Sequence, residues 1–99
     1  VEAYEKYHFD ALFCRDDNLA ITSLFALERK MIKIPQDVSV VGVDGTKNGR
    51  EINPTLASLR IDRASIVSTF FDQVEKLKKG ETPESVVLKS EFMEGESLS

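Results

Sequence analysis

Two aspartates stand where a parallel α/β sheet would bind a ligand. Asp16 follows the apolar run 11–14, and Asp44 follows the apolar run 38–43. Ligands of open parallel sheets bind beyond the carboxyl ends of the strands, so we expect both carboxylates at one edge of the sheet. Carboxylates there can accept hydrogen bonds from a polyol, and a helix N-terminus stabilises their charge. Two simpler roles remain open: Asp16 could serve only as a helix N-cap, and Asp44 could only shape the turn with Gly45.

The patterns of most enzyme active sites are missing. The sequence has no glycine-rich phosphate loop, no Cys-x-x-Cys and no His-Glu-x-x-His, and His8 is its only histidine. Cys14 stands before a helix N-terminus, a place that can lower a thiol pKa. Because no base lies close to it in sequence, we expect Cys14 to be a small buried hydrophobe. Asp16 and Asp17 are adjacent at a helix start and do not face one another. We therefore predict no catalytic residues, no metal site and no cofactor.

Composition narrows the class of protein further. Seventeen acidic and thirteen basic residues give a formal charge of −4, which does not favour gripping nucleic acid directly. Hydrophobic residues at 41% and charged residues at 30% are typical of a globular chain. No apolar run approaches the roughly 20 residues that span a bilayer, and no signal peptide opens the chain. These features predict a cytoplasmic protein without a membrane partner. Since the chain begins at Val1, we expect it to be part of a longer protein.

The first half of the chain predicts a strand, a helix and a second strand. The apolar runs 11–14 and 38–43 are typical of strands buried on both faces. Apolar residues recur at helical spacing between them, which predicts a helix from about 17 to 32. A crossover of this length favours a right-handed unit with parallel strands. The glycine- and asparagine-rich segment 44–55 is expected to be irregular.

The second half adds a strand and a helix. Alternation over 56–61 predicts a third strand, and Asp62 is a natural N-cap for a second helix that ends at Gly80. Residues 86–93 are expected to be extended. The residues expected on the buried faces are Ala57, Leu59 and Ile61 in the strand and Ile66, Val67, Phe70, Val74 and Leu77 in the helix. The predicted fold class is α/β, a Rossmann-like parallel sheet flanked by helices.

Four segments resemble lactose-repressor-type transcription regulators. Residues 10–20 read DALFCRDDNLA and are similar to the family's D-A-I-F-A-x-N-D-x-x-A segment. Residues 34–44 read IPQDVSVVGVD, and the family has V-P-x-D-V-S-V-V-G-x-D. Residues 54–59 resemble its P-P-L-T-T-V, and residues 91–97 resemble its terminal E-L-V-V-R-x-S. The resemblance therefore covers almost the whole chain in order.

The resemblance implies a partial periplasmic-binding-protein-like fold, with two lobes around a cleft. It implies that residues 10–44 lie in the lobe distal from DNA, residues 56–80 in the other lobe, and that the final strand crosses back. Residues 1–99 would then be the C-terminal segment of an effector-binding domain. The expected partners are a small-molecule effector, a sugar or sugar derivative, and a second copy in a homodimer. DNA would be bound only by an N-terminal domain absent from this chain.

The resemblance also implies effector contacts at Asp16 and Asp44. Asp16 matches an asparagine of the family, so the change removes a donor and adds a charge. Arg15 replaces a residue that is usually small; it could pair locally with Asp16, or reach into the cleft and favour an acidic or phosphorylated sugar. Gly95 stands where the family often has an arginine. The predicted ligand-binding residues are Asp16, Asp44 and Arg15.

Three functions remain open on the sequence. The leading one is a transcription regulator of the repressor type, in which the effector favours a closed state that binds DNA differently. The alternative is a periplasmic solute-binding protein of a sugar transporter, which shares the fold and the Val43-Asp44-Gly45 motif, although residues 34–39 favour the regulator. A third is an interaction module built on the surface of the two helices.

Overall fold

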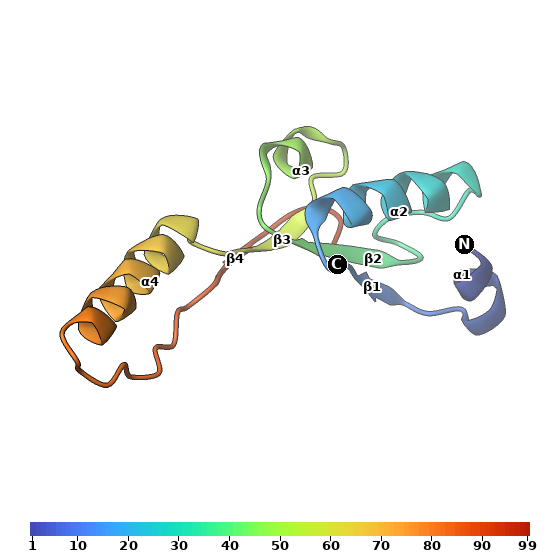
Figure 1. Cartoon of the computed structure of the whole chain (residues 1–99). Coiled ribbons are helices and arrows are strands. Elements are labelled where there is room, and N and C mark those ends of the chain that lie inside the picture. Colours follow the sequence, from blue (N-terminus) through green and yellow to red (C-terminus); the bar gives the residue numbers. More distant parts are fainter.

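The computed structural model describes all 99 residues and contains four helices and four strands. In chain order these are α1 Glu2–Tyr7, β1 Ala11–Phe13, α2 Asp17–Arg29, β2 Ser39–Val43, α3 Lys47–Glu51, β3 Ala57–Arg60, α4 Arg63–Lys78 and β4 Glu91–Met93. The molecule is elongated, with principal extents of 59 × 28 × 19 Å. Figure 1 shows the sheet in the centre, α2 lying along it, α1 at one end and α4 projecting from the other.

The strands form one sheet in the order β1-β2-β3-β4. β1 and β3 flank β2 and run parallel to it, whereas β4 runs antiparallel to β3. The β1–α2–β2 unit therefore has the parallel strands that its crossover length predicted. The predicted α/β class, a mainly parallel sheet with helices beside it, is confirmed.

The core lies between α2 and the sheet. Three residues of α2 at helical spacing, Ala20, Leu24 and Leu27, are buried against β2 and the segments around it. The buried apolar cluster consists of Cys14, Ala20, Leu24, Leu27, Ile32, Ile34, Val38, Val40 and Leu56. Burial of a leucine side chain contributes about 1.5–3 kcal/mol, so α2 supplies a large part of the folding energy.

The predicted burial of the strands was correct for β2 and wrong for β1. β2 lies between two partners, and only Val41 and Val43 are partly accessible. β1 lies at the edge of the sheet, so Ala11 and Phe13 are exposed. In β3, Ala57 and Ser58 are buried, whereas the expected inward-facing Ile61 lies beyond the strand and is exposed. The apolar runs therefore predicted that strands form, but not whether a strand lies at the edge or in the centre of the sheet.

The segment between β2 and β3 is more regular than predicted. It contains the short helix α3, whose N-cap Thr46 accepts a hydrogen bond from the Gly49 amide through its hydroxyl, 3.4 Å away. At the other end of the chain, the expected extended stretch narrows to β4, and residues 86–88 form no strand.

Helix α4 has the predicted bounds but not the predicted burial. Asp62 caps its start and Gly80 follows its end with a positive φ of 79°. None of its residues is buried, and the apolar residues expected to face a core are exposed or half-exposed. The helix projects beyond the sheet, so the apolar pattern is present without a surface against it (Figure 1).

Residues 56–80, expected to lie in a second lobe, include both a strand of the sheet and a helix beyond it. β3 is hydrogen-bonded to β2 along three residue pairs, Val41 with Ala57 to Val43 with Leu59, and so belongs to the same sheet as β1 and β2. Helix α4 and the segment directly after it lie away from that sheet, and the chain returns to it at β4 (Figure 1). The division of the chain into two lobes stays a prediction.

The last residues of the chain are built into the sheet. Ser97 is fully buried, and its carbonyl accepts a hydrogen bond from the Val40 amide at 2.9 Å. Its hydroxyl donates to the Val40 carbonyl at 2.6 Å and accepts from the Ala57 amide at 2.9 Å. A Cβ at Gly95 would lie 2.6 Å from the Thr55 carbonyl oxygen. Close packing of the backbone therefore explains glycine at position 95, where the family often has arginine.

No helix of the chain is both long and apolar enough to cross a bilayer.

The open face of α4 predicts that the 99-residue chain self-associates. Its two aromatic residues, Phe70 and Phe71, have 62% and 60% of their surface accessible. Monomers rarely leave such apolar patches uncovered. We expect sedimentation velocity to show a dimer or larger species that grows with concentration. Phe70→Ser with Phe71→Ser should shift the protein toward monomer.

Asp72→Ser is the matched control, because it changes an exposed residue of α4 without removing apolar surface. A chain that stays monomeric at every concentration, or a control that dissociates as readily, would contradict this prediction.

Candidate functional site

A cavity lies beyond the carboxyl ends of β2 and β3. Its volume is about 540 Å³, within the roughly 300–1,000 Å³ typical of small-molecule sites. Its walls come from the β2–α3 junction, the end of β3 and the first turn of α4. The lining residues are Asp44, Gly45, Thr46, Lys47, Arg60, Ile61, Asp62, Arg63 and Ala64. This is the edge of the sheet at which the sequence predicted a ligand.

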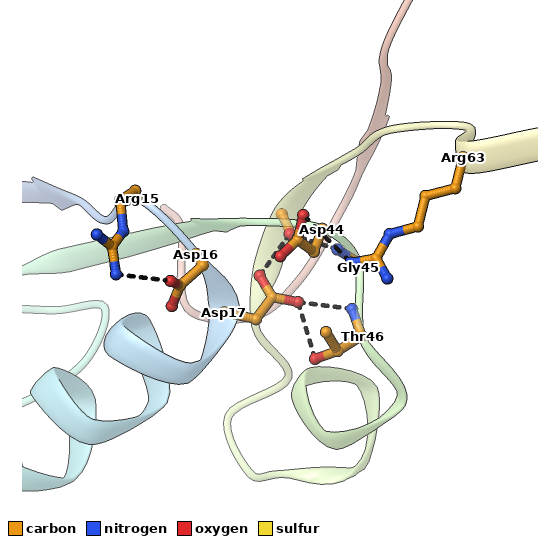
Figure 2. A network of polar contacts seen from close by, with 8 residues as sticks. Arg15, Asp16, Asp17, Asp44, Gly45, Thr46 and Arg63 are labelled. Carbon is orange, nitrogen blue, oxygen red and sulfur yellow. Dashed lines mark hydrogen bonds and ion pairs between the residues drawn. The ribbon is translucent and has the colours of Figure 1, made fainter. Parts of the chain in front are cut away.

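Asp44 lies in the wall of this cavity. Its amide donates to the Leu59 carbonyl at 2.7 Å, which holds the end of β2 against β3. Its φ of 112° is rare for a residue with a side chain, and strained backbone of this kind clusters at functional sites. One carboxylate oxygen lies 3.8 Å from the Arg63 guanidinium, a long ion pair (Figure 2). Asp44 is thus held at the predicted place, beside a cation that the sequence did not single out.

Asp16 and Arg15 lie outside the cavity. Asp16 caps α2 and accepts a hydrogen bond from the Leu19 amide at 2.8 Å. The Arg15 guanidinium is 3.4 Å from the other Asp16 oxygen, and its side chain is 86% exposed. Exposed pairs of this kind contribute at most about 1 kcal/mol. In Figure 2, Arg15 and Asp16 lie on one side of Asp17, and Asp44 lies on its other side. The structure therefore shows the capping role and the local ion pair, and effector contacts from Asp16 and Arg15 stay predictions.

Asp17 is 1% exposed, and its carboxylate contacts the β2–α3 junction that forms part of the cavity wall. One of its oxygens accepts from the Ser58 hydroxyl at 2.6 Å. The other accepts from the Thr46 amide at 2.6 Å and the Thr46 hydroxyl at 3.0 Å (Figure 2). Ser58 in turn accepts from the Gly45 amide at 3.0 Å. Asp17 thereby joins the start of α2 to β3 and to the turn that follows Asp44.

Sequence reasoning missed Asp17 because it compared the residue only with its neighbour Asp16. A signal was present in the glycines. A Cβ at Gly42, inside β2, would collide with the Asp17 carboxylate, and one at Gly49 would lie 3.3 Å from it. Glycine in a strand interior often marks a close approach of another group. Here the approaching group is a buried charge.

Two side chains have a shifted pKa, the thiol of Cys14 and the carboxyl of Asp62. Burial raises the pKa of the Cys14 thiol, and the nearby Asp16 charge adds to this, against a smaller lowering by the Ser23 hydroxyl. Hydrogen bonds from the Ser65 hydroxyl and amide lower the pKa of Asp62 on the cavity wall. No group of three or more histidine, cysteine or acidic side chains converges to hold a metal ion.

A parallel sheet with a polar cavity beyond its strand ends defines an α/β ligand-binding protein. Residues 2–98 match the periplasmic binding protein-like domain family, and the chain belongs to this family.

Similar proteins agree with this assignment. The HTH-type transcriptional repressor PurR of Escherichia fergusonii is 30% identical over 91 residues, which are 90% of this chain and 27% of that protein. A LacI family transcriptional regulator from Arthrobacter sp. FB24, solved with lactose, has a TM-score of 0.79 at 24% identity and covers 99% of this chain and 38% of its own. The Escherichia coli transcriptional repressor ascG has a TM-score of 0.81 at 22% identity, covering 98% and 36%. The chain thus spans about a quarter of the length of the repressor that it matches.

Removing the charge of Asp17 should destabilise the fold. In Asp17→Asn an amide NH₂ replaces one acceptor oxygen and faces hydrogen-bond donors. Hydrogen bonds to charged groups contribute about 1.5–3 kcal/mol, so we expect the free energy of unfolding to fall by about that amount. Urea denaturation measures it. Asp16→Asn is the control and should change stability by less than about 0.5 kcal/mol, because asparagine caps helices as well as aspartate. Equal effects of the two variants would contradict the conclusion that the hydrogen bonds of Asp17 stabilise the contact of α2 with β3 and the turn after Asp44.

Burial and the raised pKa of Cys14 predict an unreactive thiol. Since the thiolate is the reactive form, native protein at pH 8 should react with a thiol reagent at least about ten-fold more slowly than protein unfolded in urea. Absorbance kinetics with a disulfide reagent measure both rates. Similar rates in the two states would show that Cys14 is accessible in the folded protein and would contradict this prediction.

Proposed function

We propose that this chain is the effector-sensing part of a transcription repressor. A small metabolite, a sugar or sugar derivative, binds in the cavity beyond β2 and β3, and its binding changes how an N-terminal domain outside this chain binds DNA. The observation that carries the proposal is the position of Asp44 at the end of β2. Its backbone has a rare positive φ, and its carboxylate lies in the wall of the cavity. Membership of the periplasmic binding protein-like family and the likeness to repressors support it.

The chemistry of the cavity suits hydroxyl groups. The 3.8 Å separation from Arg63 leaves the Asp44 carboxylate free to accept hydrogen bonds from two neighbouring hydroxyls of a polyol. Thr46 is less available, because its hydroxyl donates to Asp17 and accepts from Gly49. Asp44 is therefore the main acceptor that the sheet offers to a ligand.

Coupling to DNA follows from the walls of the cavity. Asp44 belongs to the end of β2, whereas Arg63 belongs to the first turn of α4. A ligand that contacts both sides favours one position of α4 relative to the sheet. Such a ligand shifts the population of two states by its difference in affinity for them, and DNA binding then reports that shift. We infer that the protein works as a homodimer in the cytoplasm, because the relatives that it matches are transcription repressors.

The competing functions fit less well. An enzyme would need an activated nucleophile or base, and Cys14 is buried with a raised pKa. A periplasmic solute receptor would share the fold, but the relatives that the chain matches are repressors. A module built on both helices would need two free helix faces, whereas the apolar face of α2 is buried in the core.

Asp44→Asn tests the proposal. The variant keeps the size of the side chain and one acceptor but removes the charge. Because a charged hydrogen bond contributes about 1.5–3 kcal/mol, we expect ligand affinity to fall by about ten- to a hundred-fold. The stability of the unliganded protein should change by less than about 0.5 kcal/mol, because asparagine tolerates positive φ and the Arg63 pair is exposed. Calorimetry of the full-length protein against a sugar panel gives the affinity.

Glu75→Gln is the matched control, because it removes an exposed carboxylate that pairs with Lys78, and both residues lie outside the cavity. Its ligand affinity should stay within about two-fold of the parent. If Asp44→Asn unfolds the unliganded protein while ligand affinity is preserved, Asp44 is a turn residue and the proposed site is wrong.

A further inference from the structure

Three cationic side chains from three different elements line the cavity. Lys47 begins α3, Arg60 ends β3 and Arg63 begins α4. Against them stand two carboxylates, Asp44 and Asp62. Lys47 is paired with Glu51 of α3 at 3.7 Å, which leaves two guanidinium groups on the cavity wall of a chain with a net charge of −4. Convergence of cations in one hollow of an acidic chain needs an explanation.

The carboxylates of the wall leave hydrogen-bond donors of the two arginines unused. Asp62 is hydrogen-bonded to the hydroxyl and amide of Ser65, at 2.7 and 3.3 Å, as the cap of α4. Asp44 is 3.8 Å from Arg63, beyond hydrogen-bonding distance. Arg60 lies within 4.0 Å of no carboxylate oxygen, and its stem packs beside Gly45. Two guanidinium groups are thus left with unused donors beside the cavity.

We propose that the ligand of this cavity carries an anionic group, a phosphate or a carboxylate, on a polyhydroxyl body. The anionic group lies between Arg60 and Arg63, and the hydroxyls are bound by Asp44. This inference rests on the proposed function and names the chemical class of its ligand.

The chemistry of arginine fits this role. A guanidinium presents paired donors that match the oxygens of a phosphate or carboxylate, and such charge-assisted hydrogen bonds are among the strongest in proteins. The first turn of α4, a helix of 16 residues, faces the same cavity and adds its partial positive charge. Selection for an acidic sugar, which the sequence suggested for Arg15, is therefore assigned to Arg60 and Arg63, because Arg15 lies outside the cavity.

The test compares neutral sugars with their acidic derivatives in the full-length protein. Calorimetry is run with hexoses and pentoses, each beside its terminal phosphate ester, and with the uronic acids of the hexoses. We expect one acidic form to bind at least ten-fold more tightly than its neutral parent. The phosphate and uronic acid arms show which anionic group the cavity takes. Inorganic phosphate is the third arm and should bind far more weakly than the sugar derivative.

Variants then assign the preference to residues. Arg60→Gln with Arg63→Gln should weaken binding of the acidic sugar at least ten-fold and leave its neutral parent within about two-fold. Arg29→Gln is the matched control, an exposed arginine in the last turn of α2 and outside the cavity, and should change neither affinity. Arg15→Gln separately tests the contact that the sequence suggested. Urea denaturation of each variant shows that the exposed substitutions leave the fold intact.

The outcomes separate this inference from the proposed function. Neutral and acidic sugars that bind equally, with an affinity lost in Asp44→Asn, overturn the anionic ligand and keep the sugar-binding site. A preference that survives the double variant, or disappears in Arg15→Gln, overturns the assignment to Arg60 and Arg63. If inorganic phosphate binds as tightly as a sugar phosphate, the proposal that the ligand has a polyhydroxyl body is wrong. If no sugar of the panel binds, both the inference and the sugar-sensing proposal fall.

Discussion

The buried carboxylate of Asp17 is the constraint on which the candidate site depends. An isolated charge in a protein interior is costly, and no cation lies beside this one to balance it. It is stabilised instead by donors from Ser58 and Thr46 and by its position in the first turn of α2. The donors come from two segments, β3 and the turn before α3, so satisfying the charge fixes these segments relative to α2.

That arrangement places the residues that face the cavity. Thr46 and Gly45 are both held to the Asp17 network, which determines the path of the chain directly after Asp44. Asp44 is therefore kept at a φ that few side chains adopt, with its carboxylate in the cavity wall. The network also explains why glycine stands at position 42, where any side chain would collide with the buried carboxylate. One interaction thus links the packing of α2 to the geometry of the site.

The sequence predicted what depends on local pattern and missed what depends on distant contacts. Apolar periodicity gave α2 and α4, and the rule for strand ends placed Asp44 correctly. The contacts of Asp17 and the positions of Arg60 and Arg63 in the cavity wall could not be predicted, because each follows from which segments meet across the sheet.

The apolar pattern also could not predict which helices and strands are exposed to solvent. Residues such as Phe70 have helical apolar spacing whether or not a surface covers them, so α4 was expected to be buried and is open. The strand at the sheet edge, β1, was misjudged for the same reason. Helix α3 has only five residues, too few for a periodic signal.

The burial of Ser97 has a consequence for the order of folding. Ser97 bonds to Val40, 57 residues earlier, and to Ala57, 40 residues earlier. Contacts between such distant residues require a large loop to close, and the entropy of closure delays them. While a ribosome synthesises the chain, α2 can already pack on β1 and β2. The backbone polar groups of Val40 and Ala57 that bond to Ser97 must stay hydrated until Ser97 has emerged. The strands that carry the cavity are therefore completed only after translation has passed the whole sheet.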